Sequence, residues 1–209
     1  MSRPRFDQPA CDQLAQAVRE IESRTDAEIV IVVRARSTTY RHADYLWGAI
    51  LAFLTLLFLL FSPFVFQHYW VAIDVVIFFA LGAFISSHST ALRRLLTSKE
   101  YRADAVRTGA AAMFYEAGIA NTNAEMGVLI YLSLLERRLE IIADRGVLKA
   151  MPPLEWNERV YELHRAGRVP ELDTLRQRIR ELGVLLAEHL PPTGENPNEL
   201  PDMPRFDLK

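Results

Sequence analysis

The chain has 209 residues, of which half are apolar and 24% are charged, and its formal net charge is −2. This length suffices for one domain with a substantial core, or for one domain with a membrane anchor. The near-neutral charge balance lacks the clustered basic excess of a nucleic-acid-binding protein, so no nucleic-acid partner is expected. The single cysteine, Cys11, excludes an intramolecular disulfide.

The first elements predicted are a helix over residues 9–24 and a strand over residues 28–33. In the helix, apolar residues recur at spacings of three and four, which places them on one face; they are Cys11, Leu14, Val18 and Ile21. The strand reads Glu-Ile-Val-Ile-Val-Val. A continuous β-branched run of this kind is typical of a central strand that is covered on both faces.

A long apolar segment follows, because the chain from Tyr45 to Leu92 carries one formal charge, Asp74. Residues 46–66 (LWGAILAFLTLLFLLFSPFVF) are uncharged, and as a helix they would span roughly 30 Å, the thickness of the hydrocarbon core. A second apolar run extends from residue 70 to about residue 92. The link between the runs is too short to form a domain. We therefore predict a transmembrane hairpin of two antiparallel helices over residues 45–92, in contact with the lipid bilayer.

Asp74 has two interpretations. It can be part of a proton or ion relay, or it can be an interfacial carboxylate that is hydrated or paired with His68. A lone acidic residue about one turn from the start of a helix lacks relay partners. The interfacial interpretation is therefore favoured.

Basic residues flank the hairpin on both sides and are absent from its link. Those before it are Arg34, Arg36 and Arg41, and those after it are Arg93, Arg94, Lys99 and Arg102. Lysine and arginine are enriched in the cytoplasmic flanks of transmembrane helices. The sequence thus predicts that both termini and the whole soluble domain lie in the cytoplasm.

Beyond the hairpin, the pattern predicts a helix, two strands, two further helices and a tail. Their expected bounds are 98–118, then 126–134 and 138–144, then 153–166 and 170–190, and finally 191–209. The second and third strands are close enough to pair antiparallel, whereas the helical crossover between the first and second makes those two parallel. We predict a soluble α/β domain with a small mixed sheet, made of residues 1–44 and 93–190, and an irregular proline-rich tail.

Several segments resemble the TPM domain family, in its bacterial membrane-anchored subgroup. Thr25-Asp26-Ala27-Glu28-Ile29 is similar to the family's T-G-A-E-I, residues 127–133 (GVLIYLS) are similar to its second strand, and residues 140–147 (EIIADRGV) are similar to E-I-I-A-D-x-G-I. The ending His189-Leu190-Pro191, with NELPD at residues 198–202, is also similar. The resemblance implies a three-layer α/β/α sandwich, interrupted here by the hairpin.

The same resemblance implies a range of functions. Some members of the family are acid phosphatases, some bind calcium, and others act in the assembly or modulation of membrane complexes. Many relatives have a glycine-rich G-Y-G-L-E-G-x-L-P-D loop after the third strand. In this chain residues 144–152 read DRGVLKAMP, so most of the glycine and acidic positions of that loop are missing.

One group of oxygen donors follows from the predicted topology. The end of the third strand carries Asp144, and the starts of the other two carry Asp26, Glu28, Asn123 and Glu125. Antiparallel pairing of the third strand brings all of these to one end of the sheet, which faces away from the hairpin. Such donors suit Ca²⁺ or Mg²⁺, although carboxylates in loops are usually only solvated, and that alternative is favoured.

The opposite end of the sheet is basic and rich in hydroxyl groups. Its arginines, Arg137 and Arg138, and the flanking Arg93 and Arg94, suit either an anion such as phosphate or the headgroups at a membrane surface. The membrane-surface interpretation is favoured because the basic flank lies nearby.

The sequence contains no Walker A loop, G-x-G-x-x-G, G-x-S-x-G or H-E-x-x-H motif. We therefore favour a non-catalytic function, in which a membrane-anchored TPM-like module docks on membrane-protein partners or supports their assembly at the cytoplasmic face. The alternative is a metal-dependent enzyme related to the acid phosphatases.

Overall fold

The structure is a computed structural model, and it describes residues 6–64, 67–122, 124–194 and 199–208. The chain forms two compact units. One contains the residues up to Ser37 and those from Ala103 onward, and the other contains Thr38–Arg102. The second unit interrupts the first in sequence.

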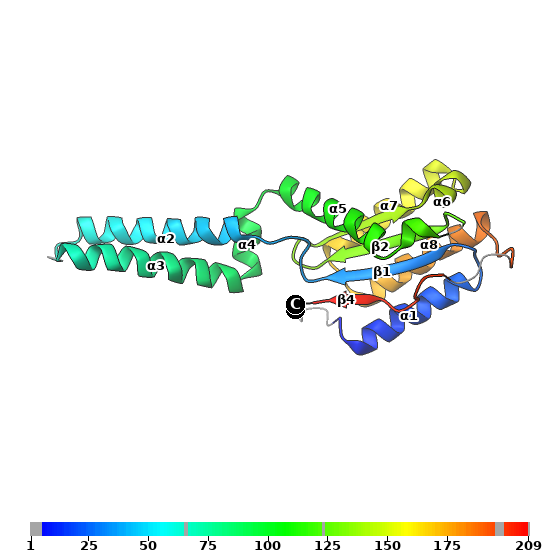
Figure 1. The fold of residues 1–209 in the computed structure, drawn as a ribbon, viewed down its shortest axis with the longest axis horizontal. Coiled ribbons are helices and arrows are strands. Elements are labelled where there is room, and N and C mark those ends of the chain that lie inside the picture. Colours follow the sequence, from blue (N-terminus) through cyan, green and yellow to red (C-terminus); the bar gives the residue numbers. More distant parts are fainter. Residues whose placement is uncertain (1–5, 65–66, 123, 195–198, 209) are drawn as a thin grey trace. The chain divides into compact units, whose positions relative to one another are not determined.

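The first unit contains a mixed four-stranded sheet (Figure 1). Its strands are β1 (Glu28–Arg34), β2 (Gly127–Ser133), β3 (Arg138–Ala143) and β4 (Arg205–Asp207), in the order β3-β2-β1-β4. Strand β1 pairs parallel with β2 and with β4, and β2 pairs antiparallel with β3. The predicted directions of the first three strands are therefore confirmed.

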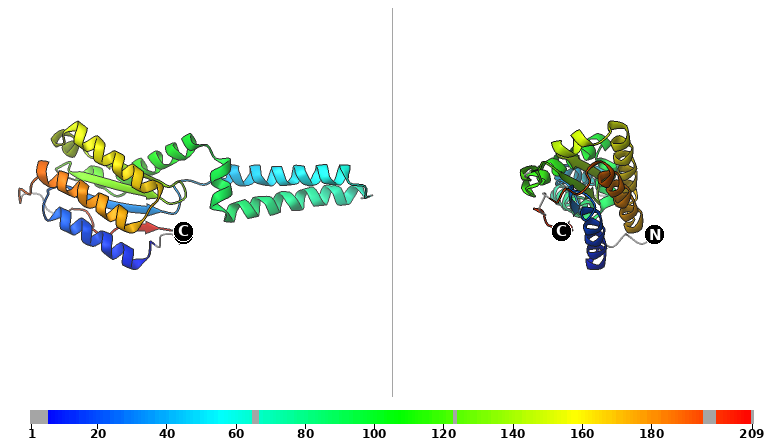
Figure 2. Two further views of the ribbon diagram at one scale, coloured as in Figure 1. Left: turned by 180° about the vertical axis from the view of Figure 1, so that it is seen from behind. Right: turned by 90° about the vertical axis from the view of Figure 1, so that its right-hand side faces the viewer.

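Helices lie on both faces of this sheet. Side chains of β1 alternate between two buried clusters, with Ile29, Ile31 and Val33 in one and Val30 and Val32 in the other. The first cluster is completed by α1 (Gln8–Glu22), α7 (Pro153–Arg168) and α8 (Leu172–His189), which lie side by side in Figure 2. The second is completed mainly by α5 (Lys99–Glu116). A strand that is apolar on both faces requires such double coverage, and the predicted mixed α/β class is confirmed.

Local signals in the sequence explain several element boundaries. The side chain of Asp7 caps α1 by accepting a hydrogen bond from the backbone N–H of Ala10 (3.3 Å). Helix α5 ends before Gly118, which has a φ of +77° and leads into the 3₁₀ helix η1 (Ile119–Asn121). The short helix α6 (Arg145–Ala150) was not anticipated; its N-cap is Asp144, directly after β3.

Strand β4 departs from the expectation of an irregular tail. Its three residues pair with β1, and the carbonyl of Asp207 accepts a hydrogen bond from the N–H of Ala35 (2.8 Å). Phe206 packs edge-to-face on Phe6, with ring centroids 5.9 Å apart. A three-residue strand has no readable periodicity in the sequence, so its pairing depends on the edge that β1 offers.

The second unit contains α2 (Arg41–Phe61), α3 (His68–His88) and the short helix α4 (Thr90–Leu96). Helices α2 and α3 run antiparallel and side by side (Figure 1). Both are long and apolar enough to cross a membrane. The first begins five residues earlier than the predicted 46–66, and the second run is divided at Ser89 rather than continuing to residue 92.

Candidate functional site

Large apolar side chains cover the outside of α2 and α3. Those on α2 include Phe53, Leu54, Phe58, Leu60 and Phe61, and those on α3 include Ile73, Val76, Ile77 and Phe84. Phe61 is 83% exposed. Soluble proteins rarely expose a continuous apolar surface of this kind, which marks a membrane or protein interface.

The seam between the two helices is made of small residues. A side chain at Gly48 would place its Cβ 2.7 Å from the carbonyl oxygen of Phe79, and one at Gly82 would place its Cβ 3.0 Å from the Cα of Gly48. Ala52 and Ser86 are also buried on the seam. Small residues let the backbones of apolar helices approach closely, which is how helices associate in membranes.

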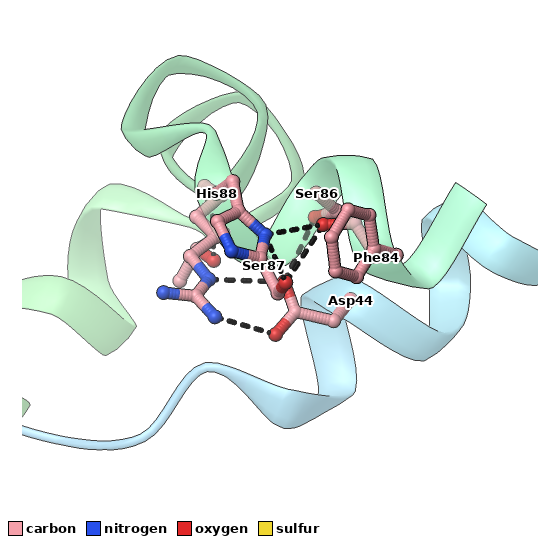
Figure 3. Close-up of polar contacts among 7 residues, drawn as sticks. Asp44, Phe84, Ser86, Ser87 and His88 are labelled. Carbon is pink, nitrogen blue, oxygen red and sulfur yellow. Dashed lines mark hydrogen bonds and ion pairs between the residues drawn. The ribbon is translucent and has the colours of Figure 1, made fainter. Parts of the chain in front are cut away.

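A buried polar cluster closes one end of the helix pair (Figure 3). The carboxylate of Asp44, on the first turn of α2, accepts hydrogen bonds from the guanidinium of Arg93 at 2.9 and 2.7 Å. It also accepts one from the Ser86 hydroxyl on α3, at 2.9 Å. Asp44 and Ser86 are 7% and 0% exposed. We call these three residues the polar base; they join all three helices of the unit.

Local structure places Arg93 in this cluster. Helix α3 ends at His88, and the side chain of Ser89 caps α4 by accepting a hydrogen bond from the N–H of Leu92 (3.4 Å). This break turns the chain, so that α4 leaves the direction of α3 (Figure 1). The negative charge of the Asp44 carboxylate is also stabilised by its position in the first turn of α2, at the positive end of the helix dipole.

Asp74 lies in the middle of the first half of α3 and is half-buried. In the described part of the chain, no hydrogen bond or ion pair joins it to another residue, His68 included. Pairing with His68, one of the two forms of the interfacial interpretation, is thus not seen, because residues six apart on one helix do not face each other.

The sequence-predicted acidic residues do lie at one end of the sheet. Glu28 pairs in register with Gly127, and the N–H of Asp144 donates to the carbonyl of Gly127 (2.8 Å). Glu125 is exposed, with a φ of +54°. Among the described residues, no group of three or more His, Cys, Asp or Glu side chains is arranged to hold a metal ion. Asn123 lies outside the described residues.

The carboxylates at this end hold backbone segments in place. Asp26 accepts hydrogen bonds from the N–H and hydroxyl of Thr193, at 3.0 and 2.6 Å. Glu28 accepts one from the N–H of Glu199 (3.0 Å), and Asp144 accepts one from the N–H of Arg145 (2.7 Å). Each carboxylate therefore fixes a loop or a helix start.

Sequence reasoning missed a further acidic residue at this end, Glu22. Its carboxylate accepts a hydrogen bond from the N–H of Ile29 (2.8 Å). Burial raises the pKa of Glu22 from its ordinary value of 4.5 to about 7, and the nearby carboxylates of Asp202 and Glu28 add to this effect. Burial likewise raises the pKa of Glu28. The end of the sheet thus contains partly buried acids that repel one another.

At the opposite end of the sheet, a polar network connects β2 and the turn after it to Ser37, which follows β1. The hydroxyl of Ser133 donates to Glu136, whose other oxygen accepts from the N–H of Ser37 (3.0 Å). The hydroxyl of Tyr131 bonds that of Ser37 (3.1 Å). Ser133 and Glu136 are buried, so this network is internal and structural.

The four arginines named from the sequence have different environments. Arg137 lies in the turn between β2 and β3 with a φ of +51°, and Arg138 is the first residue of β3; both side chains are exposed. Arg94 is half-buried on α4. The guanidinium of Arg93 binds the carboxylate of Asp44 within the polar base.

The polar base itself was not anticipated from the sequence. Asp44 lies directly before the apolar segment Tyr45–Leu92, and it is separated from Arg93 by 49 positions. Neither residue belongs to a motif. The one available signal was that an acidic and a basic residue flank the two ends of an antiparallel hairpin, which must meet.

No family model matches this chain, and no curated protein matches it. One similar solved structure is the NMR structure of the BA42 protein from the psychrophilic bacterium Bizionia argentinensis. The two are 15% identical in sequence, with a TM-score of 0.58 over 97% of this chain and 96% of the other. At this level of identity the likeness concerns the fold alone.

Proposed function

We propose that this protein is a membrane-anchored TPM-like domain that docks on membrane proteins or supports their assembly at the cytoplasmic face. The observation that carries the proposal is the outward apolar surface of α2 and α3. Each helix has 21 residues, which at ~1.5 Å per residue is about the thickness of the hydrocarbon core. The helix pair is then the anchor, and the α/β unit is the part available to partners.

The distribution of basic residues supports the orientation. Arg41 begins α2, and Arg93 and Arg94 lie on α4, directly after α3. The described part of the link between the helices contains no lysine or arginine. The basic end of a hairpin faces the cytoplasm, so the α/β unit and both termini are cytoplasmic.

The use of the acidic side chains supports a non-catalytic role. The carboxylates of Asp26, Glu28 and Asp144 each accept hydrogen bonds from the backbone. Side chains that already organise loops are suited to shaping a binding surface. The metal-dependent hydrolase that the family resemblance implies is the competing proposal.

Two measurements test the anchor and its orientation. The full chain should stay with membranes after alkaline carbonate extraction. In a Cys11→Ser background, a cysteine at Gln67 should react with an impermeant maleimide from outside the cytoplasm, whereas a cysteine at the exposed Glu188 should react only after permeabilisation. Release by carbonate would refute the anchor, and the reverse labelling would refute the orientation.

A third measurement separates the docking module from the hydrolase. Purified full chain in detergent is assayed for phosphatase activity with Ca²⁺, Mg²⁺ or chelator. The docking proposal expects no hydrolysis and no metal-dependent change in melting temperature. Metal-dependent hydrolysis that Asp144→Ala abolishes would replace it with the enzyme.

A further inference from the structure

A carboxylate that bonds to none of the described residues lies within the apolar part of α3. Asp74 follows the start of the helix by six residues, or about 9 Å, and it is the only Asp, Glu, Lys or Arg between Tyr45 and Leu92. It makes no hydrogen bond or ion pair with any described residue. The predicted helix begins at residue 70, whereas α3 begins at His68, so Asp74 lies deeper than the single turn expected for an interfacial carboxylate. Hydrocarbon offers no hydrogen-bonding group, so a polar side chain at this depth gains strongly from a partner.

The surroundings of Asp74 form a face on which another helix can pack. Trp70 and Ile77 lie four residues before and three residues after it, on the same side of α3. They are 52% and 54% exposed. Helix α2 contacts a different side, through Gly82 and Ser86. We call Trp70, Asp74 and Ile77 the lateral face of α3.

We propose that the lateral face binds a transmembrane helix of another membrane protein, which supplies an arginine or lysine to Asp74. Charge complementarity identifies this occupant. A second copy of the chain in the same orientation would bring a second carboxylate to the same depth and no lysine or arginine, and like charges at short range repel. This inference rests on the proposed membrane anchor, and it specifies the kind of partner that the anchored protein binds.

The test uses a synthetic peptide as the partner helix. The full chain, with Cys11→Ser and a fluorophore on a cysteine at Gln67, is placed in phosphatidylcholine vesicles. The peptide is a ~20-residue leucine-alanine helix with an acceptor dye and one arginine at the depth of Asp74. Control peptides carry leucine at that position, or the arginine near the other end. Energy transfer reports binding.

The arginine peptide should bind about tenfold more tightly than the leucine peptide, as expected for one polar contact between helices in lipid. Asp74→Leu should remove this difference, and Asp74→Asn should keep part of it. Ile77→Trp should weaken binding by crowding the lateral face, whereas Val76→Trp, on another side of α3, should not.

Three outcomes would overturn the proposal. They are equal binding of the arginine and leucine peptides, a preference for arginine that survives in Asp74→Leu, and self-association of the chain through Asp74 without peptide. Carbonate extraction of the same vesicles tests the membrane anchor separately from the lateral face. A chain that is extracted refutes the anchor, whereas a chain that is retained without arginine preference refutes the lateral face alone.

Discussion

At the scale of single residues, the polar base makes the most definite prediction. Asp44 and Arg93 have side chains only 10% and 11% exposed, and they share two hydrogen bonds. Removing one partner of a buried ion pair strands the other charge and costs about 3–5 kcal/mol, whereas removing both costs less. Arg93→Ala should therefore destabilise the helical unit more than Asp44→Ala with Arg93→Ala. Thermal unfolding in detergent micelles measures both, and equal single and double effects would contradict an ionic coupling.

Glu22 makes a prediction about pH. Its pKa is about 7 in the folded chain and near 4.5 when unfolded, so the folded state holds the proton more tightly and unfolding releases it between these values. The free energy of unfolding should therefore fall as pH rises from 4.5 to 7. The full shift corresponds to about 3 kcal/mol, which partial solvent exposure reduces to roughly 1–2 kcal/mol.

Glu22→Gln tests this linkage, because glutamine keeps an acceptor for the N–H of Ile29 without a charge. The variant should be more stable than the parent at pH 8 and closely similar near pH 4.5. Urea unfolding followed by circular dichroism at both pH values measures the difference. The exposed Glu188→Gln serves as the control and should leave the pH profile unchanged; an identical change in both variants would count against Glu22.

At the scale of elements, the seam between α2 and α3 depends on Gly82. Because its Cβ would meet the Gly48 backbone at 3.0 Å and Leu51 at 3.1 Å, a larger side chain must push the helices apart. Gly82→Leu should destabilise the helix pair by about 1–3 kcal/mol. Spin labels on α2 and α3 should report a larger separation. Ala80→Leu, on the exposed side of α3, should leave the separation unchanged, and an equal effect of both would exclude the seam as the cause.

At the scale of the whole molecule, the α/β unit is built from two sequence segments that meet without the helical unit. The side chain of Ser37 lies against Gly109 in α5, so the chain on either side of the insertion is held close together within the unit. Both buried clusters of the sheet consist of residues from this unit. A unit with its own complete core can fold alone.

Replacement of residues 38–102 by a short glycine-serine linker should therefore give a water-soluble, monomeric α/β protein. The full chain should in contrast require detergent, because α2 and α3 expose their apolar surface. Light scattering and circular dichroism without detergent measure the outcome. Aggregation of the shortened protein would show that its core depends on the inserted helices.

Elements with strong patterns were predictable from the sequence. The β-branched run of β1, the antiparallel pairing of β2 and β3, and the amphipathic spacing of α1 and α8 each follow from local periodicity. The apolar hairpin follows from length and the absence of charge. The meeting of Glu28 and Asp144 at one end of the sheet also follows, since strand directions determine it. Each of these features is indicated by a residue pattern that lies within one element or within a few neighbouring elements.

Only the tertiary structure decided which distant groups meet. The pairing of Asp44 with Arg93, the addition of β4 beside β1, and the burial that raises the pKa of Glu22 each join residues far apart in sequence or depend on what covers them. The sequence shows which side chains can carry a charge, but it does not show how far each is buried or which group it binds. The sequence by itself therefore determined the elements with strong periodicity and the apolar hairpin. The short elements and the polar contacts between elements depended on packing, because burial is a property of the assembled fold.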